Sequence, residues 1–124
     1  MRLYTKDHTW VLADGLRARV GISEFAQGEL GDIAYVELPA AGTRISRGEV
    51  ACTVDSLKSS SEVYAPVSGT VVESNAALTA EENCALVNTD PLGKGWLFVI
   101  EMSEPGELET LLPEKEYKDY VQGG

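Results

Sequence analysis

The stretch VACTVDSLKSSSEVYA, residues 50–65, begins and ends in residues that favour β-strands and holds short polar residues between them. Val54 and Val63 suit a pleated, half-buried surface, whereas the aspartate and the serines suit a turn. This pattern predicts a β-hairpin with Lys58 at or beside its tip. The lysine would be solvated, and its short neighbours would not hinder an enzyme that approaches it.

Lys58 has two interpretations. A lysine on a protein surface most often serves only solubility. The chain has only five lysines, however, and a lysine on a narrow hairpin tip is a good place to attach a prosthetic group. The attachment would form an amide, which replaces the positive charge with a neutral group. We therefore take Lys58 as the candidate modification site.

The composition indicates one small β-rich domain. With 124 residues, 44% of them hydrophobic, the chain can bury a modest core. Twelve glycines and an aromatic content of 7% are typical of a mainly β fold with many tight turns. We expect residues 1–124 to form a single domain, with its core at about 16–102 and a C-terminal helical extension at 104–121.

The charge narrows the class of partner. A formal net charge of −10 argues against nucleic acid, whose phosphates would repel this surface. No apolar run approaches the length of a membrane span. Residues 1–7 resemble neither a signal peptide nor a transit peptide. We expect a monomer in the bacterial cytoplasm that binds neither nucleic acid nor membrane.

Several elements around the hairpin can be predicted from local signals. The Asp-Gly turn at residues 13–15 indicates a hairpin between residues 10–12 and 16–22. In the second of these strands, alternation predicts one buried face, made by Leu16, Ala18, Val20 and Ile22. Ser23 and Gly31 are suitable caps for a short helix over residues 24–30. Further strands are predicted at residues 32–38, 70–74 and 96–100.

The C-terminal part changes to helix-forming residues from Glu104 onward. Leu108, Leu111 and Leu112 lie at helical spacing, which predicts a helix that packs on the body of the domain. A second amphipathic turn follows Pro113, with its apolar side made by Tyr117, Tyr120 and Val121.

A weak internal repeat has an offset of 36 residues. It aligns Val36 with Val72 and Lys58 with Lys94, together with several scattered positions. If the repeat is structural, two similar halves form a pseudo-symmetric pair of small sheets, and each half presents a lysine at a hairpin tip. The alternative is chance similarity. Glycines and a proline surround Lys94 and suit a structural turn, which favours Lys58 as the modified residue.

Residues suited to catalysis are scarce. His8 has no nucleophilic partner at a suggestive spacing, so we expect it to pack or cap near Trp10 rather than act as a general base. The sequence has no glycine-rich phosphate loop and no zinc signature. Cys52 and Cys84 have apolar neighbours, which indicates reduced, partly buried thiols rather than a disulfide. This inventory fits a carrier better than an enzyme.

At this point the residues resemble a known family. The segments 55–59 and 63–69, DSLKS and VYAPVSG, are similar to the lipoyl-attachment region of the glycine cleavage system H proteins. The similarity extends in order over nearly the whole chain. It includes the segments at residues 8–10, 20–22, 30–32, 36–39, 86–88, 95–96 and 107–112.

The resemblance implies a fold, a cofactor and a set of site residues. The fold would be a hybrid barrel-sandwich of the lipoyl/biotinyl type, with lipoate attached covalently to Lys58. Gly42, Asp55 and Gly69 would match the pattern that lipoylating enzymes recognise. Asp55 replaces the usual glutamate at its position, which is a mild departure. Biotin is less suitable as the attached group, because the lysine of biotin carriers lies between methionines.

The family also implies a cleft for the loaded arm. Glu62 matches an acidic position just after the lysine, and His8, with Asp7 beside it, matches the N-terminal side of the cleft. Thr9 stands where many members carry an acidic residue. One carboxylate of the expected cleft is therefore missing from this chain.

By this resemblance the chain is a shuttle. It would carry an aminomethyl group from glycine decarboxylase to aminomethyltransferase, and dihydrolipoamide dehydrogenase would reoxidise the arm. A lipoate ligase or a lipoyl/octanoyl transferase would attach the arm. The main alternative is an H-like protein that relays lipoyl groups to other complexes. A small enzyme that acts through His8 and nearby carboxylates is the remaining alternative.

Overall fold

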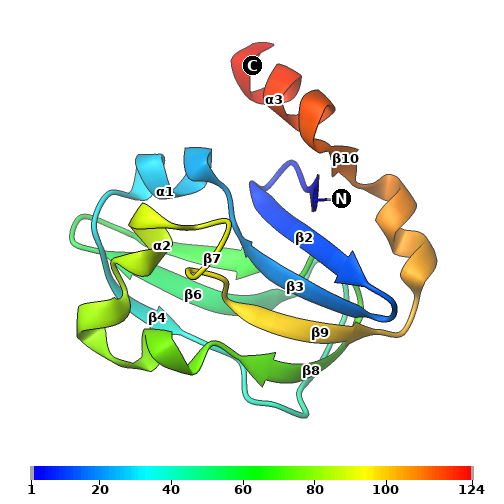
Figure 1. Cartoon of the computed structure of the whole chain (residues 1–124), viewed down its shortest axis with the longest axis horizontal. Coiled ribbons are helices and arrows are strands. Elements are labelled where there is room, and N and C mark those ends of the chain that lie inside the picture. Colours follow the sequence, from blue (N-terminus) through cyan, green and yellow to red (C-terminus); the bar gives the residue numbers. More distant parts are fainter. Residues whose placement is uncertain (1, 124) are drawn as a thin grey trace.

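Two antiparallel β-sheets form the body of the chain in the computed structural model, which describes residues 2–123 (Figure 1). Met1 and Gly124, the ends of the predicted domain, lie outside the described residues. The larger sheet has seven strands in the order β10-β1-β2-β3-β9-β8-β5, and the smaller has three in the order β4-β6-β7. The strands are β1 Arg2–Tyr4, β2 Thr9–Asp14, β3 Arg17–Ile22, β4 Ile33–Glu37, β5 Arg44–Ile45, β6 Val50–Ser56, β7 Ser60–Tyr64, β8 Gly69–Ser74, β9 Phe98–Met102 and β10 Leu112–Pro113.

The core consists of the inward residues of both sheets. Alternation in β3 buries Ala18, Val20 and Ile22, as the sequence predicted, and in β6 it buries Cys52 and Val54. The side chains of β9 and β7 join these in one apolar cluster. Full burial of an aliphatic or aromatic side chain contributes about 1.5–3 kcal/mol, so this cluster is the main force that holds the sheets together.

Leu16 differs from the prediction. It was expected on the buried face of the second strand, but its side chain is 56% exposed. The turn between β2 and β3 extends through Leu16, so β3 begins one residue later, at Arg17. A turn residue does not share the alternation of the strand that follows it, which explains the error.

The first helix matches its predicted bounds and caps. Helix α1 spans Glu24–Leu30, and the Ser23 hydroxyl oxygen accepts a hydrogen bond from the Ala26 N–H at 3.2 Å. Gly31 ends the helix with φ 81°, a left-handed conformation that glycine adopts without a steric penalty. The N–H of Gly31 donates to the carbonyl of Gln27.

The C-terminal extension is less regular than predicted. Residues Pro105–Thr110 form a 3₁₀-helix, η3, and Leu112–Pro113 pair with β1 as the edge strand β10. Only then does a regular α-helix follow, α3 over Glu114–Gly123, which lies above the N-terminal strands in Figure 1. Proline has no backbone N–H to donate. It is tolerated in β10 because this strand lies at the sheet edge and pairs on one side only.

The internal repeat is only partly structural. Strands β4 and β8 correspond at the offset of 36 residues, but they lie in sheets of unequal size. The segment that corresponds to β6 forms α2, Leu86–Thr89, and a turn that contains Lys94. The turn is fixed by Asp90, whose carboxylate accepts from the Lys94 N–H at 2.9 Å. The predicted second hairpin tip therefore does not form, and the remaining helices η1 Ala76–Thr79 and η2 Glu81–Asn83 lie before α2.

The architecture is a mainly β barrel-sandwich with a short helix in its N-terminal half and helices at its C-terminus. Among residues 2–123, no helix combines the length and the apolar character needed to cross a lipid bilayer.

Candidate functional site

The hairpin β6–β7 presents Lys58 to solvent at its tip, as predicted. Ser56 organises the loop: its N–H donates to the carbonyl of Ser59 at 2.8 Å, and its hydroxyl oxygen accepts from the Ser59 N–H at 3.0 Å. The Lys58 N–H donates to the same hydroxyl at 3.3 Å. These short-range bonds hold the loop closed without using the lysine side chain.

A backbone hydrogen bond joins the hairpin tip to the segment between α1 and β4. The Leu57 N–H donates to the carbonyl of Asp32 at 3.0 Å. The lysine side chain lies against Gly31, where an added Cβ would be only 3.4 Å from Cε of Lys58. The C-terminal end of a helix carries a partial negative charge, so this position favours the ammonium group.

Lys58 fits the attachment of a prosthetic group. The residue is exposed, and its Nζ makes no ion pair within the described part of the chain. Amide formation therefore breaks no salt bridge and buries no charge. The loop is held by its backbone and by Ser56, so the modified side chain can move while the tip keeps its shape.

The residues expected to serve recognition by the lipoylating enzyme lie in two places. Asp55 is next to the tip on β6, where its carboxylate accepts a hydrogen bond from the Ser60 hydroxyl. Gly42 and Gly69 lie at the β5–β8 edge of the larger sheet, where the Gly42 N–H donates to the carbonyl of Val71 at 2.7 Å. The atoms closest to Gly69 belong to β9, and Gly42 faces open space. The structure thus places Asp55 beside Lys58, but it does not bring the glycines into contact with the tip.

His8 packs against aromatic side chains of α1 and α3. Its ring lies 4.6 Å from the ring of Phe25 on α1, centroid to centroid, and Nδ1 is 2.7 Å from the hydroxyl of Tyr117 on α3. The Tyr117 hydroxyl is also 2.8 Å from Oγ of Ser23, the N-cap of α1. A tyrosine from the C-terminal helix therefore joins His8 to the start of α1. His8 has φ 69°, an uncommon conformation for a residue with a side chain.

The expected cleft residues are only partly brought together. His8 lies at the N-terminal part of α1, and Lys58 lies at its C-terminal end, so one short helix connects them. Glu62 is on β7, exposed on the outer face of the three-stranded sheet, where its carboxylate accepts from the Tyr64 hydroxyl at 3.5 Å. No described contact joins Glu62 to His8. Thr9 is buried in β2.

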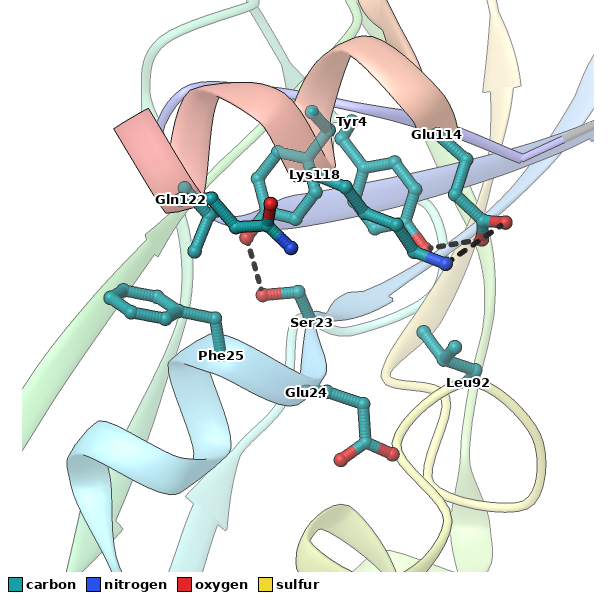
Figure 2. Close-up of a pocket in the computed structure, with 10 residues that line it drawn as sticks. Tyr4, Ser23, Glu24, Phe25, Leu92, Glu114, Lys118 and Gln122 are labelled. Atoms are coloured by element: carbon teal, nitrogen blue, oxygen red, sulfur yellow. Dashed lines mark hydrogen bonds and ion pairs between the residues drawn. The ribbon is translucent and has the colours of Figure 1, made fainter. Parts of the chain in front are cut away.

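Sequence reasoning missed the contacts that aromatic residues make between α1 and α3. Figure 2 shows Ser23, the N-cap of α1, and Phe25 facing α3 across a pocket. The volume of this pocket is about 270 Å³. Tyr4 and Tyr117 stack in its wall with their ring centroids 4.3 Å apart. A smaller hollow beside it, about 200 Å³, is lined by His8, Phe25, Tyr120 and Val121. The signal for these contacts was the apolar side of α3, but the sequence did not indicate which element it would cover.

The two cysteines are buried and are not joined in a disulfide. Burial raises the pKa of the Cys52 thiol to about 12, with the charge of Glu37 as a smaller cause. A thiol attacks a disulfide only as the thiolate, so Cys52 stays unreactive toward a disulfide-bearing arm at neutral pH.

Burial makes His8 a source of acid sensitivity. Desolvation lowers the pKa of His8 below 6.5, opposed by the charges of Asp7 and Glu29. Between the lowered folded value and the unfolded value of 6.5, the unfolded chain binds more protons than the folded one. The contribution of His8 to stability is therefore complete above pH 6.5 and is lost as the pH falls through its folded pKa.

The substitution His8→Asn tests this, since asparagine tolerates positive φ. We expect the urea midpoint of the unsubstituted chain to fall more than that of the variant between about pH 7.5 and about pH 5.5. Apart from Asp7 and Glu29, whose charges act on His8, the carboxylates contribute alike in both proteins, so the difference reports on His8 and its interactions. Equal losses in the two proteins would contradict the assignment.

A barrel-sandwich body with an exposed lysine on a hairpin tip defines a class: carrier proteins that hold a prosthetic group on that lysine. The model of the family described as glycine cleavage H-protein matches residues 2–124. The chain belongs to this family.

Individual proteins of this family are similar to the chain over nearly its whole length. A glycine cleavage system H protein of Thermotoga maritima is 47% identical over 120 residues, covering 97% of this chain and 95% of the relative. One from Xanthobacter autotrophicus is 50% identical over 118 residues, covering 95% of this chain and 93% of the relative. The crystal structure of a glycine cleavage system H protein from Mycobacterium marinum superposes with a TM-score of 0.84 at 38% identity, covering 99% of this chain and 97% of that one.

Proposed function

We propose that this chain is the lipoyl-bearing carrier of a glycine cleavage system, with lipoate in amide linkage to Lys58. The observation that carries the proposal is the exposed amine of Lys58 on a hairpin tip that is fixed by its own backbone bonds. Because the chain belongs to the glycine cleavage H-protein family, we assign it to the glycine cleavage system. The chain acts as a carrier and leaves catalysis to its partners.

A bound lipoyl group supplies a disulfide that can be reduced as the aminomethyl group is transferred. The part of this chain is to hold the attachment point and to give the loaded arm a resting place. Gly31 leaves room for the lysine stem at the end of α1, and Phe25 and His8 continue the same path toward the other end. Helix α1 has seven residues and is about 10 Å long.

Carboxylates near this path suit a protonated amine. Asp7 precedes His8 and is exposed, and Glu29 is close enough to His8 to influence its pKa. We place these two, together with Glu62 on the neighbouring sheet, as the groups that would pair with the amine of the cargo. Because Glu62 does not contact His8, we expect Asp7 and Glu29 to contribute more than Glu62 on the side of α1.

The partners follow from this role. They are glycine decarboxylase, aminomethyltransferase, dihydrolipoamide dehydrogenase and the enzyme that attaches lipoate, all in the bacterial cytoplasm. Asp55, which lies beside the hairpin tip, would contact the attaching enzyme. Gly42 and Gly69 lie at the β5–β8 edge, away from the lysine, and would affect recognition only through the fold.

Reconstitution tests the proposal. With purified decarboxylase, labelled bicarbonate should enter glycine when the lipoylated chain is present and should not when the unmodified chain replaces it. Addition of aminomethyltransferase and tetrahydrofolate should then release ammonia. A lipoylated chain that supports neither reaction, but gives up its lipoyl group to another acceptor protein, would favour the relay function instead.

A further inference from the structure

The outer face of the three-stranded sheet bears two tyrosines and three carboxylates. Alternation in β4, β6 and β7 turns Val36, Val54 and Val63 into the core and leaves the intervening side chains outside. We call these outward residues the tyrosine–carboxylate face: Tyr35, Glu37, Asp55, Glu62 and Tyr64. Tyr35 is 51% exposed and Tyr64 37%, so both side chains are partly open to solvent.

This face is uniformly acidic. Its strands read IAYVE, VACTVDS and SSEVY, and none of them contains a lysine, an arginine or a histidine. Glu37 and Glu62 both lie beside Thr53 across the middle of the sheet, and Asp55 lies between Tyr35 and Ser60 near the tip. Lys58 is the single cation at the end of the hairpin that this face continues.

The enzyme that modifies Lys58 has to bring its active site to the hairpin tip. Before modification, Nζ stands only at the end of a four-carbon stem, so the active site of that enzyme must reach the loop itself. A stable protein interface covers about 800 Å² on each partner, far more than the loop at residues 57–59 can offer. The exposed surface continuous with the loop on the side of Asp55 is the tyrosine–carboxylate face. After lipoate is attached, the longer arm can enter the active sites of later partners, so these partners do not have to contact the loop.

We propose that the tyrosine–carboxylate face is the docking surface for the lipoate-attaching enzyme, whose contacting rim carries arginine or lysine side chains. Guanidinium groups pair with carboxylates through two parallel hydrogen bonds and also lie over tyrosine rings. Tyrosine and arginine are the residues that most often dominate binding at interfaces. This inference rests on the proposed function, because it presupposes that Lys58 receives lipoate.

The test uses the complete chain in its unmodified form with purified lipoate ligase, lipoate and ATP. Initial rates of mass addition are measured against the concentration of the chain. For the double variant Glu37→Gln/Glu62→Gln we expect KM for the chain to rise about tenfold, with kcat within about twofold and a weaker dependence on salt. Tyr35→Thr, which keeps a strand-forming residue, should raise KM about fivefold.

The matched control removes the same charge elsewhere. Glu73 and Glu101 are exposed on β8 and β9 of the other sheet, and Glu73→Gln/Glu101→Gln should leave KM within about twofold. Equal KM values for the two double variants would overturn the docking proposal, since only total charge would then matter. Urea midpoints for all variants establish that each remains folded.

Two other outcomes are also decisive. If the unsubstituted chain gains no mass from the ligase, the carrier function fails and the docking proposal fails with it. If the unsubstituted chain gains mass normally and Glu37→Gln/Glu62→Gln does so with the same KM, only the docking proposal fails. A dimer of the unmodified chain that dissociates in this variant would assign the face to self-association and would also overturn the proposal.

Discussion

Replacement of Lys58 with arginine is expected to abolish lipoate attachment completely while the chain stays folded. The guanidinium group remains protonated at any pH that a protein tolerates, so it offers no nucleophilic lone pair for amide formation. The side chain of Lys58 is exposed and forms no ion pair among the described residues, so the exchange should change stability by less than about 0.5 kcal/mol. Intact mass after coexpression with a lipoate ligase measures the loss directly.

Lys94→Arg is the matched control for this experiment. Lys94 is also exposed, and it occupies the position that the internal repeat aligns with Lys58. It lies in a turn fixed by Asp90 rather than at a hairpin tip, so an enzyme that reads the hairpin should ignore it. We expect Lys94→Arg to gain the full lipoyl mass. A mass addition that persists in Lys58→Arg and maps to Lys94 would contradict the assignment of the site.

The same pair of variants separates the classes of function. A carrier loses all acceptor activity with Lys58→Arg, because the amine is the attachment point. An enzyme that worked through His8 would keep its turnover, since His8 contacts Phe25 and Tyr117 and its interactions do not involve Lys58.

Short-range signals predicted the hairpin and the first helix well. The strands of residues 50–65 alternate between apolar and polar side chains, and the serines between them make the hydrogen bonds that close the loop. The caps of α1 are Ser23 and Gly31, because a hydroxyl and a residue with positive φ satisfy needs that arise within one turn of the chain. Such features depend only on neighbours in sequence.

Long-range contacts account for what the sequence did not indicate. The bond between His8 and Tyr117 joins residues 109 positions apart, and no local pattern selects that partner. Residues 112–113 pair as a strand because β1 offers a free edge, which overrides their predicted helical spacing. The internal repeat predicted a strand where the structure has α2. Similarity at scattered positions does not ensure that the same secondary structure forms.

Gly69 is another residue whose long-range contacts the sequence did not indicate. The family resemblance implies that Gly69 serves recognition by the lipoylating enzyme, and the structure adds a packing role. An added Cβ would lie 2.1 Å from the carbonyl oxygen of Glu101 and 3.1 Å from a side-chain carbon of Ile100. The first of these is backbone of the paired strand β9 and cannot rotate away.

We therefore expect Gly69→Ala to lower the free energy of unfolding by about 3 kcal/mol or more, because β8 has to move away from β9. Urea unfolding measures this change. Gly42→Ala is the comparison: φ is 93° there, but an added Cβ meets nothing within 4 Å, so only backbone strain of about 1–2 kcal/mol applies. A loss for Gly69→Ala no larger than that for Gly42→Ala would contradict the packing explanation.

Lipoylation of these two variants then separates packing from recognition. If Gly69 acts only through the fold, its variant should gain lipoate at the normal rate per folded molecule, at a temperature where the folded state still dominates. If the enzyme reads the glycine itself, the rate per folded molecule falls although the protein is folded. Because Gly69 contacts β9 and not the hairpin tip, we expect the first result, with Lys58 as accessible in the variant as in the unsubstituted chain.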